Sequence, residues 1–162
     1  LDAASSQPDR AILDALAAAG AGIDILPDAI RIRKDGLKAF DFNAADCPDL
    51  FPPLVALACA CEGETKLHGA LRLKGKESDR ASALREEFGA LGAIVEVEGD
   101  AMIVRGAGRL RGGAADSRGD HRIAMAAAVA ALISETPVEI SGPDCVAKSW
   151  PGFFEDFASV AR

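Results

Sequence analysis

The sequence predicts a mixed α/β (α+β) protein built from a repeated strand–helix–strand–helix–strand–strand unit. The first observation is a pair of apolar runs without a charged residue, Leu50–Cys61 and Ile123–Ile133, which are long enough to form buried helices. The second is a pair of short alternating segments around Gly99-Asp100, which is typical of a β-hairpin. The third is that matching features recur about 71 residues apart along the chain.

The beginning of the chain predicts a helix, a hairpin and a strand. The helix should begin near Pro8, because proline is favoured in a first turn and Ser6-x-x-Asp9 resembles a capping box. It should end at Gly20. The strands expected next are Ile23–Leu26 and Ile30–Arg33, joined around Pro27-Asp28, and then Ala39–Asn43.

Two helices of different character follow in the middle of the chain. Leu50–Cys61 should form a helix that is buried on all sides, because it carries no charge. A second helix should run from Ser78 to about residue 90, because Ser78 is a good N-cap. Its apolar residues recur at helical spacing, at Leu84, Phe88 and Leu91. The other elements expected are strands at 65–73, 94–98, 102–105, 110–116 and 138–141, and helices at 123–133 and 152–161.

Charged residues occupy equivalent places in successive units. Asp49 and Asp120 each precede an uncharged helix, about 71 residues apart. Lys76 and Lys148 each precede an amphipathic helix, at nearly the same spacing. A repeat of this length with two strand–helix pairs and a hairpin accounts for both observations.

The repeat divides the chain into units of a single domain. The units expected are an incomplete first unit at about 1–35, a complete unit at about 36–106 and a third unit at about 107–162. Since the chain starts at Leu1 within a unit and without an initiator Met, we expect it to be part of a longer polypeptide.

Composition limits the class of protein. The 162 residues suffice for one domain with a core, or for a large part of one, and 49% of them are apolar. The net charge of −7 argues against nucleic acid or an anionic membrane as partner, so any anion must be held by local clusters of Arg and Lys. The apolar runs are too short for a membrane span. Four cysteines without a metal or disulfide pattern, and only two histidines, favour a reduced cytoplasmic protein without a zinc site.

The stretch from Leu73 to Arg80 carries the first indication of function. A cation such as Arg80 in the first turn of a helix is disfavoured by about 0.3–1 kcal/mol, so a bound anion is one reason to find it there. Backbone N–H groups together with Lys76 and Arg80 would make an anion site, and Glu77 could transfer a proton. The alternative is a solvated helix start held by salt bridges.

The repeat predicts that these charges gather in one site. Parallel βα units place helix N-termini at one end of a domain. The groups expected at that end are the cations of Lys76, Arg80, Arg122 and Lys148 and the carboxylates of Asp49 and Glu77. Such a set would bind a multiply charged anion and would place acid–base groups beside it.

Three segments of the chain carry a family resemblance. They are Lys76-Glu77-Ser78-Asp79-Arg80, Asp120-His121-Arg122-Ile123-Ala124-Met125-Ala126 and Cys145-Val146-Ala147-Lys148-Ser149-Trp150-Pro151-Gly152-Phe153-Phe154. With Pro48-Asp49, they resemble the carboxy-terminal signatures of the 5-enolpyruvylshikimate-3-phosphate synthases. The resemblance implies two domains, each of three βαβαββ units with the helices inside and the sheets outside. It also implies transfer of the enolpyruvyl group of phosphoenolpyruvate to the 5-hydroxyl of shikimate 3-phosphate, through a tetrahedral intermediate that releases phosphate, without a metal or organic cofactor.

The resemblance implies a role for each site residue. Asp49 would be the base on the attacking hydroxyl, and Glu77 would donate and accept the proton at the phosphoenolpyruvate methylene. Lys76 would contact shikimate 3-phosphate. The residues that would hold phosphoenolpyruvate are Arg80, Arg122 and Lys148. Guanidinium groups suit this task because they bind carboxylate and phosphate bidentately. The remaining contacts would come from an amino-terminal domain, so this chain alone should be inactive. The complete enzyme is expected to be a monomer.

Alternatives remain for single residues and for the whole chain. Asp49 and Asp120 could be simple helix N-caps, and His121 is expected to be a structural hydrogen-bonding residue. Ser5-Ser6-Gln7 resembles a substrate-binding segment of the family's other domain, but here it opens a helix, which favours capping. Arg72 stands where the family sometimes has a polar substrate contact. A UDP-N-acetylglucosamine enolpyruvyl transferase would share the architecture, although the Lys-Glu-Ser-Asp-Arg and Asp-His-Arg motifs argue against it. A noncatalytic binding module of the same fold is the third interpretation.

Overall fold

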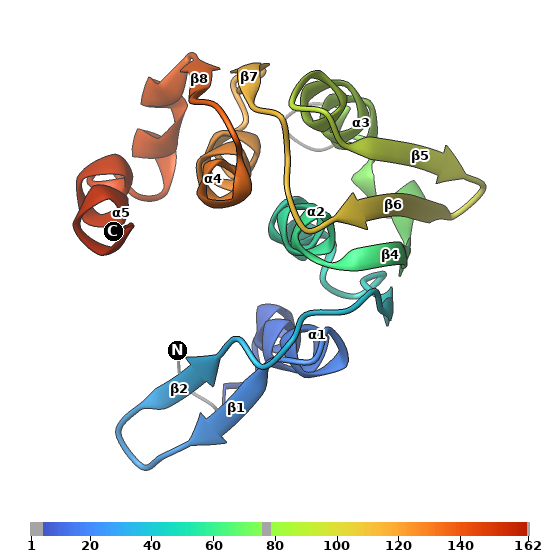
Figure 1. The fold of residues 1–162 in the computed structure, drawn as a ribbon, viewed down its shortest axis with the longest axis vertical. Coiled ribbons are helices and arrows are strands. Elements are labelled where there is room, and N and C mark those ends of the chain that lie inside the picture. The colour runs from blue at the N-terminus through green and yellow to red at the C-terminus, as the bar shows by residue number, and fades with distance from the viewer. Residues whose placement is uncertain (1–4, 76–78, 162) are drawn as a thin grey trace.

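The computed structural model describes residues 5–75 and 79–161. Within those residues the strands form three sheets, which lie around a group of helices (Figure 1). The N-terminal elements are the 3₁₀ helix η1 (Pro8–Ala11), α1 (Ile12–Ala18), β1 (Gly22–Ile25) and β2 (Ile30–Arg33). β1 and β2 pair antiparallel, which confirms the first predicted hairpin.

The middle of the chain builds the largest sheet. Its elements are β3 (Asp41–Asn43), η2 (Pro48–Leu50), α2 (Phe51–Ala60), β4 (Glu62–His68), η3 (Ala70–Leu73), α3 (Arg80–Ala90), β5 (Ile94–Glu98) and β6 (Ala101–Ala107). The strand order is β3-β4-β6-β5, in which β3 and β4 are parallel and the other neighbours are antiparallel. Apart from the 3₁₀ turns, this is the predicted strand–helix–strand–helix–strand–strand order.

The last part of the chain repeats the strand–helix–strand crossover. Its elements are β7 (Gly113–Asp116), α4 (His121–Ala130), η4 (Ala131–Ile133), β8 (Val138–Ser141), η5 (Pro143–Lys148) and α5 (Phe153–Val160). β7 and β8 are parallel and are joined through α4, as β3 and β4 are joined through α2. A parallel pair needs such a crossover, and the crossover covers one face of its sheet with a helix.

α2 and α4 form the centre of the core. Phe51 and Leu54 in α2 and Ile123 in α4 are completely buried, as expected for the two runs without charged residues. Figure 1 shows both helices nearly end-on, with the sheets outside them. β6 packs directly on α2 at Gly106, where a Cβ atom would lie 2.1 Å from the carbonyl oxygen of Ala58. The arrangement confirms the prediction of helices inside and sheets outside.

The predicted strand at 65–73 is wrong at both ends. β4 begins at Glu62 and ends at His68. Gly69 then adopts a φ of 98°, and its N–H donates to the carbonyl oxygen of Asp100 at 2.9 Å. The N–H of Leu71 donates to Oδ1 of the same aspartate at 2.8 Å. The β5–β6 turn therefore takes the hydrogen bonds that a continuing strand would need, and the chain turns into η3 instead.

Two predicted helix starts are displaced. The N-cap of α3 is Asp79, whose Oδ1 accepts a hydrogen bond from the N–H of Ser82 at 3.4 Å. The predicted cap, Ser78, lies outside the described residues. The N-cap of η1 is Gln7, so the predicted capping box between Ser6 and Asp9 is wrong.

Smaller differences concern the connections. β7 begins at Gly113, because Leu110 makes only an isolated parallel bridge to Ser134 before the chain reaches the sheet. The sequence did not predict η5, which packs against α4. Among the described residues, none of the helices is both long enough and apolar enough to cross a membrane.

Candidate active site

Asp49 lies in η2, immediately before the central helix α2. Its Oδ1 accepts a hydrogen bond from Nη1 of Arg80 at 2.8 Å, and its Oδ2 lies 2.9 Å from Nη2 of Arg122. The N-caps of η2 and α2 are Cys47 and Leu50, so Asp49 is the N-cap of neither helix. Its side chain remains 30% exposed, which leaves the carboxylate accessible between the two arginines.

Asp120 is both a helix cap and a partner in an ion pair. It is the N-cap of α4, where its Oδ1 accepts a hydrogen bond from the N–H of Arg122 at 3.0 Å. Its other oxygen, Oδ2, accepts one from Nε of Arg80 at 2.8 Å. The Asp120 side chain is completely buried, so the cap is also one half of a buried ion pair.

Arg80 is the first residue of α3 and its side chain is completely buried. A cation at this position opposes the helix dipole, and the sequence indicated a bound anion as one group that could set the local charge. The structure shows which groups do so, because Asp120 and Asp49 lie on two of the three guanidinium nitrogens. The solvated helix start considered above does not describe Arg80, since its side chain is completely buried.

Arg122 is the more exposed of the two arginines, with 29% of its side chain accessible. Its Nη1 lies 2.9 Å from Nε2 of the buried His121. The structural role expected for this histidine stays a prediction. Asp49 and Arg122 also line a pocket of about 190 Å³. The rest of its lining is apolar and consists of Pro53, Met125, Ala126 and Val129. Arg122 therefore brings a guanidinium to the edge of an otherwise apolar pocket.

Two of the other predicted residues are described, and both are exposed. Lys148 is exposed at the end of η5, the segment that packs on α4. Arg72 is exposed in the last turn of η3. Lys76 and Glu77 lie outside the described residues, so their place in the site stays a prediction.

Cysteines and metal ligands are two other kinds of group that can carry chemistry. No group of three or more His, Cys, Asp or Glu side chains in this part is arranged to hold a metal ion. Burial raises the pKa of Cys59 to about 12, so this thiol is protonated at neutral pH and is a poor nucleophile.

The arrangement joins an acid–base group to an anion-binding group. Asp49 and Arg122 reach solvent, whereas Asp120 and Arg80 are buried behind them. The buried pair fixes the two helix starts relative to each other, and the accessible pair offers a carboxylate and a guanidinium to one pocket. A carboxylate can take a proton from a hydroxyl, and a guanidinium can hold a carboxylate or phosphate.

The sequence matches one family model over residues 1–157. Its description is EPSP synthase (3-phosphoshikimate 1-carboxyvinyltransferase). A 3-phosphoshikimate 1-carboxyvinyltransferase of Clostridium novyi is 40% identical over 160 residues, which are 99% of this chain and 37% of that protein. One from Halobacterium salinarum is 39% identical over 159 residues, which are 96% of this chain and 37% of that protein.

The fold is also similar to solved structures. An EPSP synthase structure from Acinetobacter baumannii superposes with a TM-score of 0.84 at 30% identity, over 99% of this chain and 41% of that chain. A second structure of EPSP synthase from this organism gives a TM-score of 0.82 at 28% identity. This chain thus spans well under half the length of the proteins that it matches.

Proposed function

Because the chain belongs to the EPSP synthase (3-phosphoshikimate 1-carboxyvinyltransferase) family, we propose that it forms the carboxy-terminal part of an enolpyruvyl transferase. The substrates would be phosphoenolpyruvate and shikimate 3-phosphate, and the products would be the enolpyruvyl ether at the 5-hydroxyl and inorganic phosphate. The observation that carries this proposal is the Asp49 carboxylate, which lies 2.9 Å from Arg122 at the edge of a pocket.

Asp49 is suited to the role of general base. Its carboxylate is partly exposed, so a substrate hydroxyl can approach it, and it lies between the guanidinium groups of Arg80 and Arg122. In the addition step the 5-hydroxyl oxygen bonds to C2 of phosphoenolpyruvate, Asp49 takes the hydroxyl proton, and C3 gains a proton. In the elimination step phosphate leaves C2 and a proton leaves C3, which restores the double bond. Glu77 would exchange the proton at C3, as the family resemblance implies.

The cations would hold the anionic substrates. Arg122 is the first candidate for phosphoenolpyruvate, because its guanidinium is accessible in the pocket that Asp49 also lines. Lys148 is exposed on an element that packs against α4, and it would add a second cation. Arg80 is completely buried between two aspartates, so it would meet the substrate only if one of these partners moved. Lys76 would contact shikimate 3-phosphate, and the rest of the polypeptide would supply the remaining contacts.

The proposal is tested by turnover of the complete natural protein that contains this chain. Phosphate release should be measured with phosphoenolpyruvate and either shikimate 3-phosphate or UDP-N-acetylglucosamine as the acceptor. We expect release with shikimate 3-phosphate only. Release with the UDP-sugar would favour the sister transferase, and no release with either acceptor would favour a noncatalytic module.

A further inference from the structure

Helix α3 carries two buried charged residues on one face. Arg80 is completely buried and Glu87 is 6% exposed, although charged side chains are rarely buried without partners. Residues seven positions apart lie on the same side of an α-helix, two turns from each other. Arg80 binds the side chain of Asp120, so the question is what Glu87 binds two turns further along.

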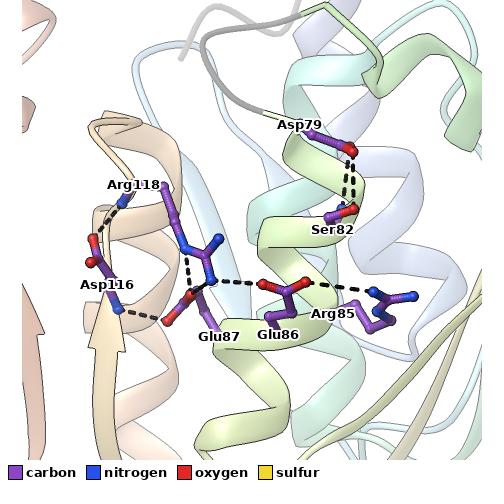
Figure 2. A network of polar contacts seen from close by, with 7 residues as sticks. All are labelled: Asp79, Ser82, Arg85, Glu86, Glu87, Asp116 and Arg118. Atoms are coloured by element: carbon purple, nitrogen blue, oxygen red, sulfur yellow. Dashed lines mark hydrogen bonds and ion pairs between the residues drawn. The ribbon is translucent and has the colours of Figure 1, made fainter.

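Glu87 binds the connection between β7 and α4 (Figure 2). Its Oε2 accepts a hydrogen bond from the backbone N–H of Asp116 at 2.7 Å, and its Oε1 accepts one from Nε of Arg118 at 2.7 Å. Nη2 of the same arginine lies 2.6 Å from Oε1 of Glu87 and 2.7 Å from Oε2 of the exposed Glu86. α3 thus holds this connection at Asp116 and Arg118 through one end of its buried face, and at Asp120 through the other.

The connection itself has a strained backbone. Arg118 has a φ of 53°, in the left-handed region that residues other than glycine rarely adopt. Its N–H donates to Oδ1 of Asp116 at 2.8 Å. The neighbouring Ser117 is buried, and its Oγ donates to the carbonyl oxygen of Gly142 at 2.9 Å. Such a conformation persists only where the surroundings enforce it, and it is often found beside functional residues.

We infer that Glu87 and Arg118 are positioning residues, which act as a clamp that sets the place of Arg122 in the site. The clamped segment leads directly into α4, which begins at His121. Any shift of the segment therefore moves the guanidinium that faces the pocket. Neither clamp residue is among the described residues that line the pocket of Asp49 and Arg122, and the inference rests on the function proposed above.

The kinetic test is Glu87→Gln in the complete natural protein. Glutamine keeps the size and an acceptor for the Asp116 N–H, but it removes the charge that holds Arg118. Since small displacements of a binding group can cost on the order of 10²-fold, we expect kcat/KM for phosphoenolpyruvate to fall by about ten- to a hundredfold. The KM for shikimate 3-phosphate should stay within about twofold, because other residues hold that substrate.

The matched control is Glu86→Gln. Glu86 is the neighbouring glutamate and also pairs with Arg118, but its side chain is 45% exposed and its contacts among the described residues are with arginine side chains. The Glu86→Gln variant should leave the KM values for phosphoenolpyruvate and shikimate 3-phosphate near those of the parent protein. An equal loss in both variants, an equal change for both substrates, or no change in Glu87→Gln would overturn the inference.

Arg118→Gly provides a second variant in case Glu87→Gln does not fold. Glycine tolerates the left-handed backbone, and the Arg118 side chain is 43% exposed, so its removal should leave the fold intact. We expect the same selective loss for phosphoenolpyruvate. Because the two residues would act as one unit, the double variant should lose no more than either single variant. If the losses of the two single variants multiply in the double variant, the clamp is overturned.

Hydrogen exchange tests the clamp without reference to activity. In Glu87→Gln the amides of residues 116–122 should exchange at least about tenfold faster than in the parent, whereas those of α2 should not change. Unchanged exchange at 116–122 would overturn the clamp even if catalysis were altered. A parent protein without transferase activity would refute the proposed function, and the exchange measurement would still decide whether the clamp exists.

Discussion

The carboxylate of Asp49 joins the start of α2 to the start of α4, because its Oδ2 lies 2.9 Å from Nη2 of Arg122. The repeat in the sequence predicted that these two helices begin at the same end of the domain, and this prediction is confirmed. The contact also means that the charge of Arg122 is partly offset by the protein itself. An anionic substrate would have to compete with Asp49 for this guanidinium, and that competition would release Oδ2 of Asp49 from Arg122.

Arg122→Lys tests the contact of this arginine with phosphoenolpyruvate. Lysine keeps the positive charge but loses the planar fork that binds a carboxylate or phosphate through two hydrogen bonds. We expect a loss of roughly 2–4 kcal/mol in transition-state binding, seen as a lower kcat/KM for phosphoenolpyruvate in the complete protein. Arg105→Lys is the control, because Arg105 is exposed on β6 and pairs with Glu96 at the surface. If kcat/KM for phosphoenolpyruvate is the same in Arg122→Lys and in the parent, Arg122 is not in the site.

Asp120→Asn tests the buried ion pair. Asparagine and aspartate are nearly equal as N-caps, so the cap of α4 should survive. Any loss of stability should therefore come from the lost ion pair with Arg80. Removing one partner of a buried pair leaves an uncompensated charge, so we expect a loss of about 3 kcal/mol in the free energy of unfolding. Urea unfolding would measure it. Asp79→Asn is the matched control, since Asp79 caps α3 but is exposed, and it should change stability very little. Equal effects would contradict the buried-pair interpretation.

Two glycine substitutions test the packing of β6 on α2. Gly106→Ala would place a Cβ atom 2.1 Å from the carbonyl oxygen of Ala58, so the strand or the helix would have to move. We expect a loss of at least about 2 kcal/mol in the free energy of unfolding. Gly89→Ala in α3 is the opposite case, because its Cβ would meet no atom within 4 Å. This variant should stabilise the protein by about 0.4–1 kcal/mol, because alanine has less conformational freedom than glycine in the unfolded chain. Thermal unfolding that ranks the two variants in the reverse order would refute this account of the core.

The parts of the fold that the sequence predicted well are those decided by local pattern. The absence of charge in Leu50–Cys61 and Ile123–Ile133 predicted the two buried helices, and alternation predicted the two hairpins. The end of β4 was missed because tertiary hydrogen bonds decide it. The strand pattern continues past Gly69, but the Asp100 turn binds the backbone there and starts a 3₁₀ turn.

The site was predicted less completely than the fold. The repeat brought Asp49 and Arg122 together, because equivalent helix starts share one end of the domain. It did not predict that Arg80 is buried against Asp120, since that depends on how α3 rotates about its axis. A signal for this rotation exists in hindsight, because Arg80 and Glu87 share the face of α3 that carries Leu84. Lys76 and Glu77 remain predictions.

The general-base role of Asp49 is the central claim, and Asp49→Asn tests it most directly in the complete protein. Asparagine cannot take the hydroxyl proton. In this variant Asp120 would still pair with Arg80 and keep the starts of α3 and α4 in place. The melting temperature should therefore fall by only a few degrees, and both substrates should still bind.

The deciding quantity is kcat for enolpyruvyl transfer from phosphoenolpyruvate to shikimate 3-phosphate. Since general-base catalysis contributes about 10²–10⁴-fold, we predict that kcat of Asp49→Asn is at least about a hundredfold lower than that of the parent. A folded variant with near-normal kcat would show that Asp49 only pairs with the arginines and that another group takes the proton.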